Sequence, residues 1–470
     1  MDTKKLRQKI LDLAIHGKLV PQDPNDEPAS ILLERIRAEK ERLIKEGKIK
    51  QSKKSAKSSD TRHYENVPFE VPESWEWTII NDICLKIGSG STPRGSNYTE
   101  EGIPFFRSQN VYNDGLAYDD IKYISEDVHK TMIGTEVRAN DLLLNITGGS
   151  LGRCAVVPNE FSKGNVSQHV CILRTIIVLP AYLHLFIISD YFAATMILSG
   201  SGREGLPKYS LEIMQFPLPP YEEQKRIVTA VDKWFTLINT LETAKEDLQT
   251  SIIQAKSKIL DLAIHGKLVP QDPNDEPAIE LLKRINPKFT PCDNGHDEKK
   301  EIPDSWIWCT LHDSFNITMG SSPTGDALNR EKQGVEFHQG KVFFSNKNIL
   351  PSDIYTTQPV KMAEPHSILL CVRAPVGTVN ITDRQICIGR GLCSLMPSKS
   401  IDLQYAYYVL QTCSKELEQK ATGSTFKAVS GDIVKKQLIP FPPYNEQLRI
   451  VKRIEELFAV LDEIQKSIEA

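Results

Sequence analysis

The sequence predicts an α/β (α+β) protein in which two similar mixed domains are separated by a long antiparallel coiled coil, with pseudo-twofold symmetry. Three observations predict this. The segment KILDLAIHGKLVPQDPNDEPA occurs unchanged at residues 9–29 and 258–278. The related stretches PPYEEQ and PPYNEQ stand at residues 219–224 and 442–447. Residues 223–265 contain no proline or glycine. Internal repeats of this kind indicate architecture before any single residue does.

The repeats also indicate a circular arrangement. The first has an offset of 249 residues and the second an offset of 223. With these offsets Ala470 maps onto position 247 and Met1 onto position 250. We therefore expect the two end segments to be split halves of one central element, so that the repeats are circularly arranged.

The order of elements predicts five segments. They are a repeated helix with a linker at 1–65, the first mixed domain at 66–221, the central repeated helix with a linker at 222–298, the second mixed domain at 299–444 and a C-terminal repeated helix at 445–470. The linkers are polar, and residues 44–59 carry six lysines without apolar periodicity.

The central helix has the pattern of a coiled coil. One seam places residues seven apart at Ile227, Trp234, Leu241, Leu248, Ala255 and Leu262, and the other holds Val231, Ile238, Lys245, Ile252 and Ile259. Gly266 follows as a stop signal. The end segments continue the seam, so we expect them to form the second strand together. One long amphipathic helix packed on a globular core remains the alternative, although it would favour a 3.6-residue period.

The two mixed domains share a series of sequence anchors. These are Trp-x-Trp at 75–77 and 306–308, small-residue loops at 88–93 and 320–323, Phe105-Phe106 with Asn110 against Phe343-Phe344 with Asn348, and apolar segments at 142–152 and 368–377. Outside these anchors the domains diverge. One scaffold with two different faces is the pattern expected of modules that recognise different targets.

Composition excludes several classes of protein. With 40% hydrophobic and 25% charged residues the chain has the composition of a soluble globular protein, and its net charge of −4 gives no global basic field. Nine cysteines without a CxxC pair argue against a disulfide framework, and Cys292 with His296 is too weak a pattern to predict a metal site. The N-terminus lacks a signal peptide and residues 170–188 are too polar for a membrane span, so we expect a cytoplasmic protein.

The LDLAIHGKLVPQDPNDEPA segments, the PPYxEQ helix starts and the twin tryptophan-bearing domains together resemble the specificity subunit of type I restriction–modification systems. The resemblance covers essentially the whole chain. It implies two target-recognition domains that each read half of a split double-stranded DNA sequence. It also implies helices that dock two modification subunits, which methylate adenine at N6, and with them restriction subunits. S-adenosylmethionine, ATP and Mg²⁺ would then belong to those partners, with no cofactor bound by this chain.

Local motifs for catalysis are missing. Amino-methyltransferases place a polar side chain before Pro-Pro-aromatic, but Leu218 and Phe441 stand there and cannot accept a hydrogen bond. No glycine-rich loop is followed by the Lys-Ser/Thr of a Walker A motif. We therefore expect a non-catalytic binding subunit. A stand-alone DNA methyltransferase and a coiled-coil scaffold without a DNA role remain the alternatives.

DNA contacts should come from basic and amide side chains on domain loops, because arginine and lysine bind phosphates while arginine, asparagine and glutamine read base edges. The candidates are Arg94, Arg107, Ser108, Gln109, Asn110, Arg153, Gln168, Arg203 and Lys208 in the first domain, and Asn346, Lys347, Asn348, Arg373, Arg390 and Lys427 in the second. Lys18 and Lys267, in the identical repeat, are the candidate partner-binding residues.

Overall fold

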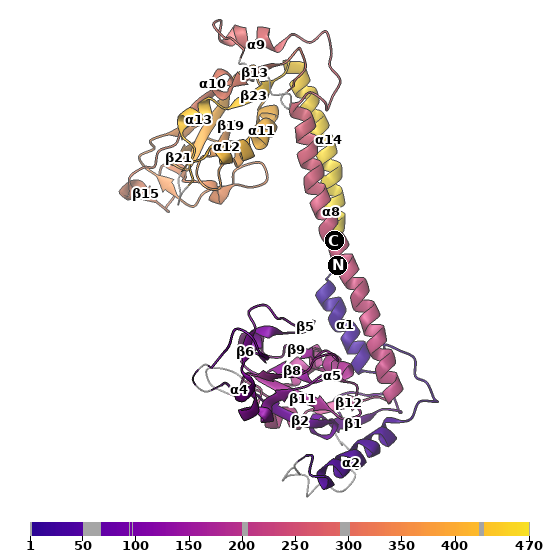
Figure 1. Ribbon diagram of the computed structural model, residues 1–470. Helices are drawn as coiled ribbons and strands as arrows, with labels where there is room; N and C mark the ends of the chain where they lie inside the picture. Colours follow the sequence, from indigo (N-terminus) through magenta and orange to yellow (C-terminus); the bar gives the residue numbers. More distant parts are fainter. Residues whose placement is uncertain are drawn as a thin grey trace. The chain divides into compact units, whose positions relative to one another are not determined.

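The computed structural model describes residues 2–49, 67–93, 95, 97–199, 205–291, 301–422 and 427–469 (Figure 1). The chain divides into two compact units, Met1–Ala244 and Lys245–Ala470. Each unit holds one mixed domain and a part of the long helix α8 (Tyr221–Ile264). Within the described ranges, no helix combines the length and the apolar character needed to cross a bilayer.

The first unit is built on two four-stranded sheets. One has the strand order β6-β3-β10-β7 and the other β2-β11-β8-β9, while β1 pairs with β12 and β4 with β5. The strands are β1 (Glu76–Ile79), β2 (Cys84–Ser89), β3 (Ile103–Phe106), β4 (Val111–Tyr112), β5 (Gly115–Leu116), β6 (Lys122–Ile124), β7 (Glu136–Val137), β8 (Leu142–Asn145), β9 (Cys154–Val156), β10 (Gly164–Val166), β11 (Val170–Thr175) and β12 (Gln215–Leu218). The α-helices before α8 are α1 (Thr3–Ile15), α2 (Ala29–Lys45), α3 (Ile80–Ile83), α4 (Glu126–Thr131), α5 (Pro180–Ile187), α6 (Asp190–Thr195) and α7 (Lys208–Glu212).

The second unit repeats this plan. Its sheets have the orders β14-β22-β19-β20 and β15-β17-β16-β21-β18, and β13 pairs with β23. The strands are β13 (Ile307–Thr310), β14 (Phe315–Met319), β15 (Leu328–Asn329), β16 (Val335–His338), β17 (Tyr355–Thr356), β18 (Met362–Ala363), β19 (Ser367–Cys371), β20 (Val379–Thr382), β21 (Ile386–Ile388), β22 (Leu392–Pro397) and β23 (Leu438–Phe441). The helices are α9 (Ala278–Ile285), α10 (Leu311–Ser314), α11 (Leu403–Thr412), α12 (Ser414–Lys420), α13 (Gly431–Lys435) and α14 (Tyr444–Glu469).

Helix α1 packs antiparallel on the first part of α8. Arg7 near the start of α1 donates to Asn239 and Glu242 at 2.6 and 2.8 Å, whereas Gln22, after α1, reaches back to Glu223. The apolar contacts join residues of α1 to Ile227, Val231 and Ile238 of α8 in one core cluster. The predicted antiparallel coiled coil is therefore formed here by α1 and α8.

Helix α14 packs on the second part of α8 in the same sense. Lys256 of α8 pairs with Asp462, far along α14, while Arg449 near the α14 start pairs with Asp275 beyond the α8 end. Ile450 and Ile454 of α14 are fully buried in the cluster that includes Ala263.

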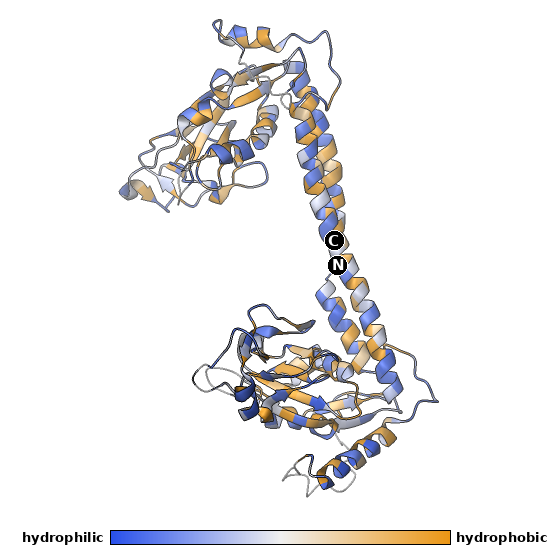
Figure 2. Cartoon of the chain, in the orientation of Figure 1, coloured by the Kyte–Doolittle hydropathy of each residue, from blue (hydrophilic) through white to orange (hydrophobic). Residues whose placement is uncertain are grey.

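The seam itself differs from the prediction. Val231, Ile238 and Ile252 are buried, but Trp234, Leu241 and Leu248 of the other seam are 48%, 44% and 42% exposed. At each point along α8 a single helix, α1 or α14, packs against it and covers only a narrow strip. The apolar face of α8 is wider than that strip, so part of it stays exposed. In Figure 2 hydrophobic and hydrophilic residues alternate along the helix. Leu237 of the same part of α8 is 49% exposed, and we call Trp234, Leu237 and Leu241, all of the first unit, the exposed stripe.

A buried carboxylate ties the first domain to α8. Glu223 is 0% exposed and accepts hydrogen bonds from Trp75 Nε1 at 3.0 Å and from Gln22 Nε2 at 2.6 Å. Burial raises the pKa of Glu223, and the two bonds oppose that rise. Gly17 lets the repeated segment approach closely, because a Cβ there would lie 2.5 Å from Pro72 and its φ is +65°. We call Gln22, Trp75 and Glu223 the glutamate clamp.

The second unit contains the same clamp. Glu446 accepts from Trp306 Nε1 at 2.9 Å and from Gln271 Nε2 at 2.6 Å. Burial raises the pKa of Glu446 in the same way. Gly266 has a φ of +64° beyond the end of α8, which confirms the predicted helix stop. The identical repeated sequence thus forms the same contacts twice.

Candidate nucleic-acid interface

Two parallel strands of the first domain end side by side at one edge of its sheet. Strand β3 pairs in parallel with β10, and Ser167 N–H donates to Phe106 O at 2.9 Å just beyond the pairing. Parallel strands end at the same edge of a sheet, which is where ligands commonly bind in α/β proteins. The loops that follow β3 and β10 therefore leave the sheet side by side.

Further hydrogen bonds bring two more loops to that edge. Asn145 Nδ2 donates to Ser108 O at 2.8 Å, Thr147 Oγ1 contacts His169 Nδ1 at 2.8 Å, and Thr147 forms an isolated bridge with Gly205. These bonds join residues 107–110, 146–153, 167–169 and 205 into one partly exposed group of loops, which we call the first loop edge.

Asp120 holds two candidate side chains of this edge. Arg107 Nη2 donates to Asp120 O at 2.6 Å and lies 3.3 Å from its Oδ2, and Gln109 Nε2 donates to Oδ2 at 2.9 Å. The bond from Gln109 and the charges of Lys122 and Arg107 lower the pKa of Asp120. The Arg107 guanidinium is thus oriented before any ligand arrives.

The other candidates of the first domain differ in accessibility. Gln168 is exposed, and Arg153 is exposed with its guanidinium 4.9 Å from the Tyr112 ring centroid. Ser108 contributes its carbonyl to Asn145, and Lys208 on α7 lies 3.4 Å from Glu212. Arg94 and Arg203 lie outside the described residues.

Asn110 is a correction to the sequence-based expectation. Its side chain is 1% exposed, its Oδ1 accepts from Arg107 N–H at 3.1 Å and its Nδ2 donates to Ala117 O at 3.2 Å. Because its amide bonds the loop backbone, Asn110 shapes the edge and presents no free group to a base.

The second domain has an equivalent edge. Strand β16 pairs in parallel with β21, and Gly391 N–H donates to Gln339 O at 3.1 Å. Val372 N–H donates to Gly391 O at 3.0 Å and Ala374 N–H to Lys427 O at 3.1 Å. Residues 339–340, 372–374, 389–391 and 427–428 form the second loop edge.

Three cations gather on the second loop edge. Arg373, Arg390 and Lys427 are exposed, and none has an ion pair with another described residue. Exposed cations on loops are available to bind phosphates or, in the case of arginine, to read base edges.

Asn346, Lys347 and Asn348 lie on a different loop. Lys347 Nζ is 3.2 Å from Glu455 of α14 and stands over the Tyr408 ring at 5.6 Å. Asn346 O accepts from Tyr407 at 2.8 Å, and the exposed Asn348 forms an isolated bridge with Ile381. Lys347 is therefore engaged by its own unit.

The register of the strands also corrects an anchor. The sequence pairing of Phe105-Phe106 with Phe343-Phe344 is wrong, because the strand equivalent to β3 is β16, which ends at His338. Phe343 instead ends a short 3₁₀ turn. The misplaced anchor hid Gln339, which directly follows β16 and lies on the second loop edge. Comparison of strand ends would have found it.

A buried ionic network supports the end of β16. Arg384 donates to both oxygens of Glu336 at 2.7 Å, Ser352 N–H donates at 2.6 Å and His338 Nε2 lies 2.8 Å away. Burial alone would raise the pKa of Glu336, but these bonds lower it to about 2. Burial lowers the pKa of His338. The network fixes the strand from which Gln339 extends.

The two positions at which an amino-methyltransferase would carry a polar side chain are apolar and buried. Leu218 and Phe441 are fully buried at the ends of β12 and β23, directly before the two prolines that precede α8 and α14. No cluster of three metal-ligating side chains occurs among the residues that the structure describes, and Cys292 and His296 lie outside them.

Comparison with known proteins gives a consistent result. The family described as "Type I restriction modification DNA specificity domain" matches residues 72–249 and 303–470. The EcoAI specificity subunit of Escherichia coli is 27% identical, with 98% of this chain and 90% of that protein covered. The MjaVIII specificity subunit of Methanocaldococcus jannaschii is 24% identical, with 82% and 87% covered.

Solved structures share the fold. The HsdS subunit from Thermoanaerobacter tengcongensis aligns with a TM-score of 0.53 at 23% identity, covering 85% of this chain and 93% of that one. A chain from a structure of type I R-M system assembly aligns with a TM-score of 0.60 at 23% identity, covering 86% and 94%. With two copies of the domain, which together span most of its length, the chain belongs to the type I restriction–modification DNA specificity family.

Proposed function

We propose that this chain is the non-catalytic specificity subunit of a cytoplasmic type I restriction–modification complex, in which each mixed domain reads one half of a bipartite double-stranded DNA target. Residues 66–221 and 299–444 would be the two recognition domains. The observation that carries the proposal is the pair of equivalent loop edges, built on one scaffold but lined by different basic and amide side chains. Two readers of different sequences require this combination.

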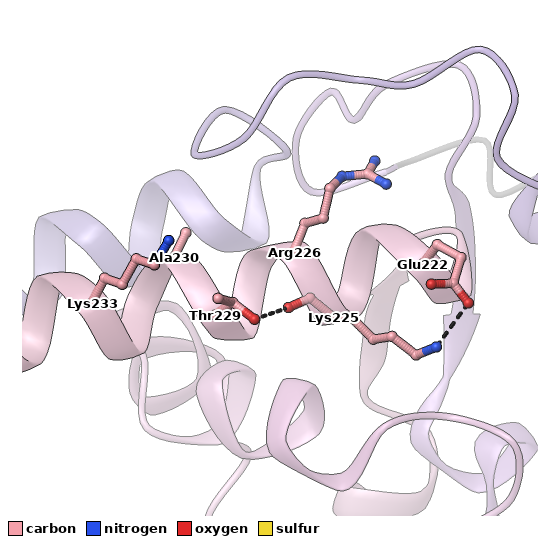
Figure 3. Close-up of a pocket in the computed structure, with 6 residues that line it drawn as sticks. All are labelled: Glu222, Lys225, Arg226, Thr229, Ala230 and Lys233. Atoms are coloured by element: carbon pink, nitrogen blue, oxygen red, sulfur yellow. Dashed lines mark hydrogen bonds and ion pairs between the residues drawn. The ribbon is translucent and has the colours of Figure 1, made fainter.

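We further propose that the helices dock two modification subunits, and restriction subunits through them. The exposed stripe supports this, because large exposed apolar patches mark interaction sites. An open groove of about 490 Å³ lies on the preceding turns of α8, lined by Glu222, Lys225, Arg226, Thr229, Ala230 and Lys233 (Figure 3). An apolar centre with a charged rim is the usual composition of a protein interface.

The identical repeat supports docking of two copies of one partner. Lys18 and Lys267 are both exposed, and the backbone N–H of each donates to a helix-end carbonyl, Leu13 O and Leu262 O, at 2.9 Å. The same surface presented twice suits two equal subunits.

The alternatives have less support. A stand-alone DNA methyltransferase would need a polar group before the paired prolines, and Leu218 and Phe441 are buried and apolar there. A scaffold without a DNA role gives no reason for two diverged loop edges.

The test is the methylome of cells that express this chain with its modification partner. A bipartite adenine-methylated motif is expected. Replacing residues 75–221 by the matching module of a relative should change one half of that motif only. A change in both halves would contradict the assignment of one domain to each half-site.

A further inference from the structure

The hydrogen-bond register makes the two loop edges comparable residue by residue. In the first domain Phe106 is paired with Val166, and in the second His338 is paired with Ile388. The bonds beyond these pairs agree, since Ser167 N–H donates to Phe106 O at 2.9 Å and Gly389 N–H to His338 O at 2.8 Å. Phe106 is therefore equivalent to His338.

A second set of bonds fixes the other strand of each pair. Ser91 N–H donates to Val166 O at 3.2 Å, and Ser321 N–H donates to Ile388 O at 3.0 Å. Both serines belong to the small-residue loops, Gly90-Ser91 and Gly320-Ser321, that the sequence itself aligns. Val166 is therefore equivalent to Ile388, and the two registers agree.

Two positions beyond the strand ends follow from this register. The residue after β3 is Arg107 and its equivalent after β16 is Gln339, while Gln168 is equivalent to Arg390. Each domain thus presents one arginine and one glutamine, in exchanged order. Arginine reads guanine and glutamine reads adenine through paired hydrogen bonds in the major groove.

We propose that Arg107 with Gln168, and Gln339 with Arg390, are the specificity-determining pairs of the two domains. The proposal rests on the proposed function and adds to it the residues that read bases. Exchange of an arginine and a glutamine between equivalent positions is a direct way for one scaffold to prefer different bases.

The second pair lies in a closely fitted site. Gln339 Oε1 accepts from Ser322 Oγ at 2.7 Å, which orients the amide and leaves that oxygen a second lone pair. A Cβ at Gly389 would lie 2.4 Å from Gln339 Oε1, and one at Gly391 would lie 2.4 Å from Gln339 O. The two glycines therefore let Gln339 approach the Arg390 loop, and Arg390 between them is exposed.

The first pair is held differently. The Arg107 side chain is 26% exposed and is oriented by Asp120, whose φ of +53° places it in the left-handed region. Arg107 Nε is buried without a partner among the described residues. An unsatisfied buried donor is unfavourable, so the present position of the guanidinium carries a cost that a hydrogen bond to Nε would remove. Gln168 is exposed, with Nε2 3.5 Å from His169 Nε2.

The test compares methylomes of cells that express the full complex with single variants. Gln339→Ala and Arg390→Ala should each relax one base position in one half of the motif, and Arg107→Ala and Gln168→Ala should relax positions in the other half. In competition binding with the purified complex, discrimination at that position should fall about 10- to 100-fold. Gln385→Ala is the matched control. Gln385 lies at the opposite end of β21 from Arg390 and the second loop edge, so its loss should leave the motif unchanged.

The outcomes are separable. If the wild-type complex methylates a bipartite motif and all four variants methylate the same motif unchanged, the proposal is overturned. Uniformly weaker binding with a salt slope reduced by about one would also overturn it, because that is the signature of a phosphate contact. Unchanged circular dichroism and thermal midpoints establish that each variant is folded. If the wild-type complex methylates no bipartite motif, the proposed function itself fails.

Discussion

Removing the carboxylate of the glutamate clamp should destabilise the first unit by a predictable amount. In Glu223→Ala, Trp75 Nε1 loses its acceptor in a site where the indole is 4% exposed. An unsatisfied buried donor costs about 1–3 kcal/mol. Gln22 is exposed and can return to water, which limits its contribution. Burial of the ionised carboxylate is itself unfavourable, which is why the pKa of Glu223 is raised. The variant removes this cost, and that gain offsets part of the lost stability.

The net loss should be about 2–3 kcal/mol, since deletion of the side chain adds a small cavity to the lost bond. For a unit of this size 1 kcal/mol corresponds to about 2–4 °C in Tm. Differential scanning calorimetry should therefore show the transition of the first unit lowered by about 4–12 °C. Glu222→Ala is the matched control, because that neighbouring carboxylate is 59% exposed and pairs with Lys225 at 2.8 Å on the surface. A surface pair contributes about 0–1 kcal/mol.

Glu223→Gln separates the charge from the hydrogen bonds. The new amide oxygen can accept from Trp75 Nε1, and the new NH₂ can donate to Gln22 if the Gln22 amide flips. The flipped Gln22 NH₂ can then donate to Ser74 Oγ, which in the wild-type protein lies 3.1 Å from Gln22 Oε1. The variant should stay within about 1 kcal/mol of wild type.

The glutamate pKa is raised in the folded state, so its favourable contribution is complete below the ordinary value and is lost as pH rises through the raised value. Wild type should thus lose stability relative to Glu223→Gln over that window. Equal effects of Glu223→Ala and Glu222→Ala, or a glutamine variant as unstable as the alanine variant, would refute the reasoning.

Three other outcomes are expected. Lys18→Glu with Lys267→Glu should lower the number of modification subunits per chain in native mass spectrometry without changing the circular dichroism spectrum; two bound subunits would exclude this surface. Glu336→Gln should destabilise the second unit at neutral pH, and because the folded pKa of Glu336 is lowered to about 2, the wild-type advantage should disappear as pH falls from 4.5 toward 2 in chemical denaturation. Arg390→Glu should weaken DNA binding in gel-shift assays more than charge reversal at Lys53 and Lys54; equal losses would mean that the second loop edge is not the binding face.

The sequence predicted the architecture because the repeats are exact where the architecture is decided. Identical residues 9–29 and 258–278 must form the same local structure, and they do so down to matched bonds at Glu223 and Glu446. The helix start after the paired prolines was also readable, since proline cannot continue a strand ladder. The seam was predicted less well. Heptad spacing identifies apolar positions, but which of them are covered depends on how far α1 and α14 reach around α8, and Trp234 remains 48% exposed.

The binding residues were harder to predict for a different physical reason. Between diverged domains, matching letters such as the two Phe-Phe pairs carry little structural information, whereas strand register is set by long-range hydrogen bonds that sequence spacing does not encode. Once β3 and β16 are aligned through their parallel partners, Arg107 and Gln339 become equivalent, and so do Gln168 and Arg390. In the sequence alone, an arginine in one domain and a glutamine in the other do not look related, because nothing shows that they occupy equivalent positions. Placed on the same two strand ends, they become a hypothesis about which bases each domain reads.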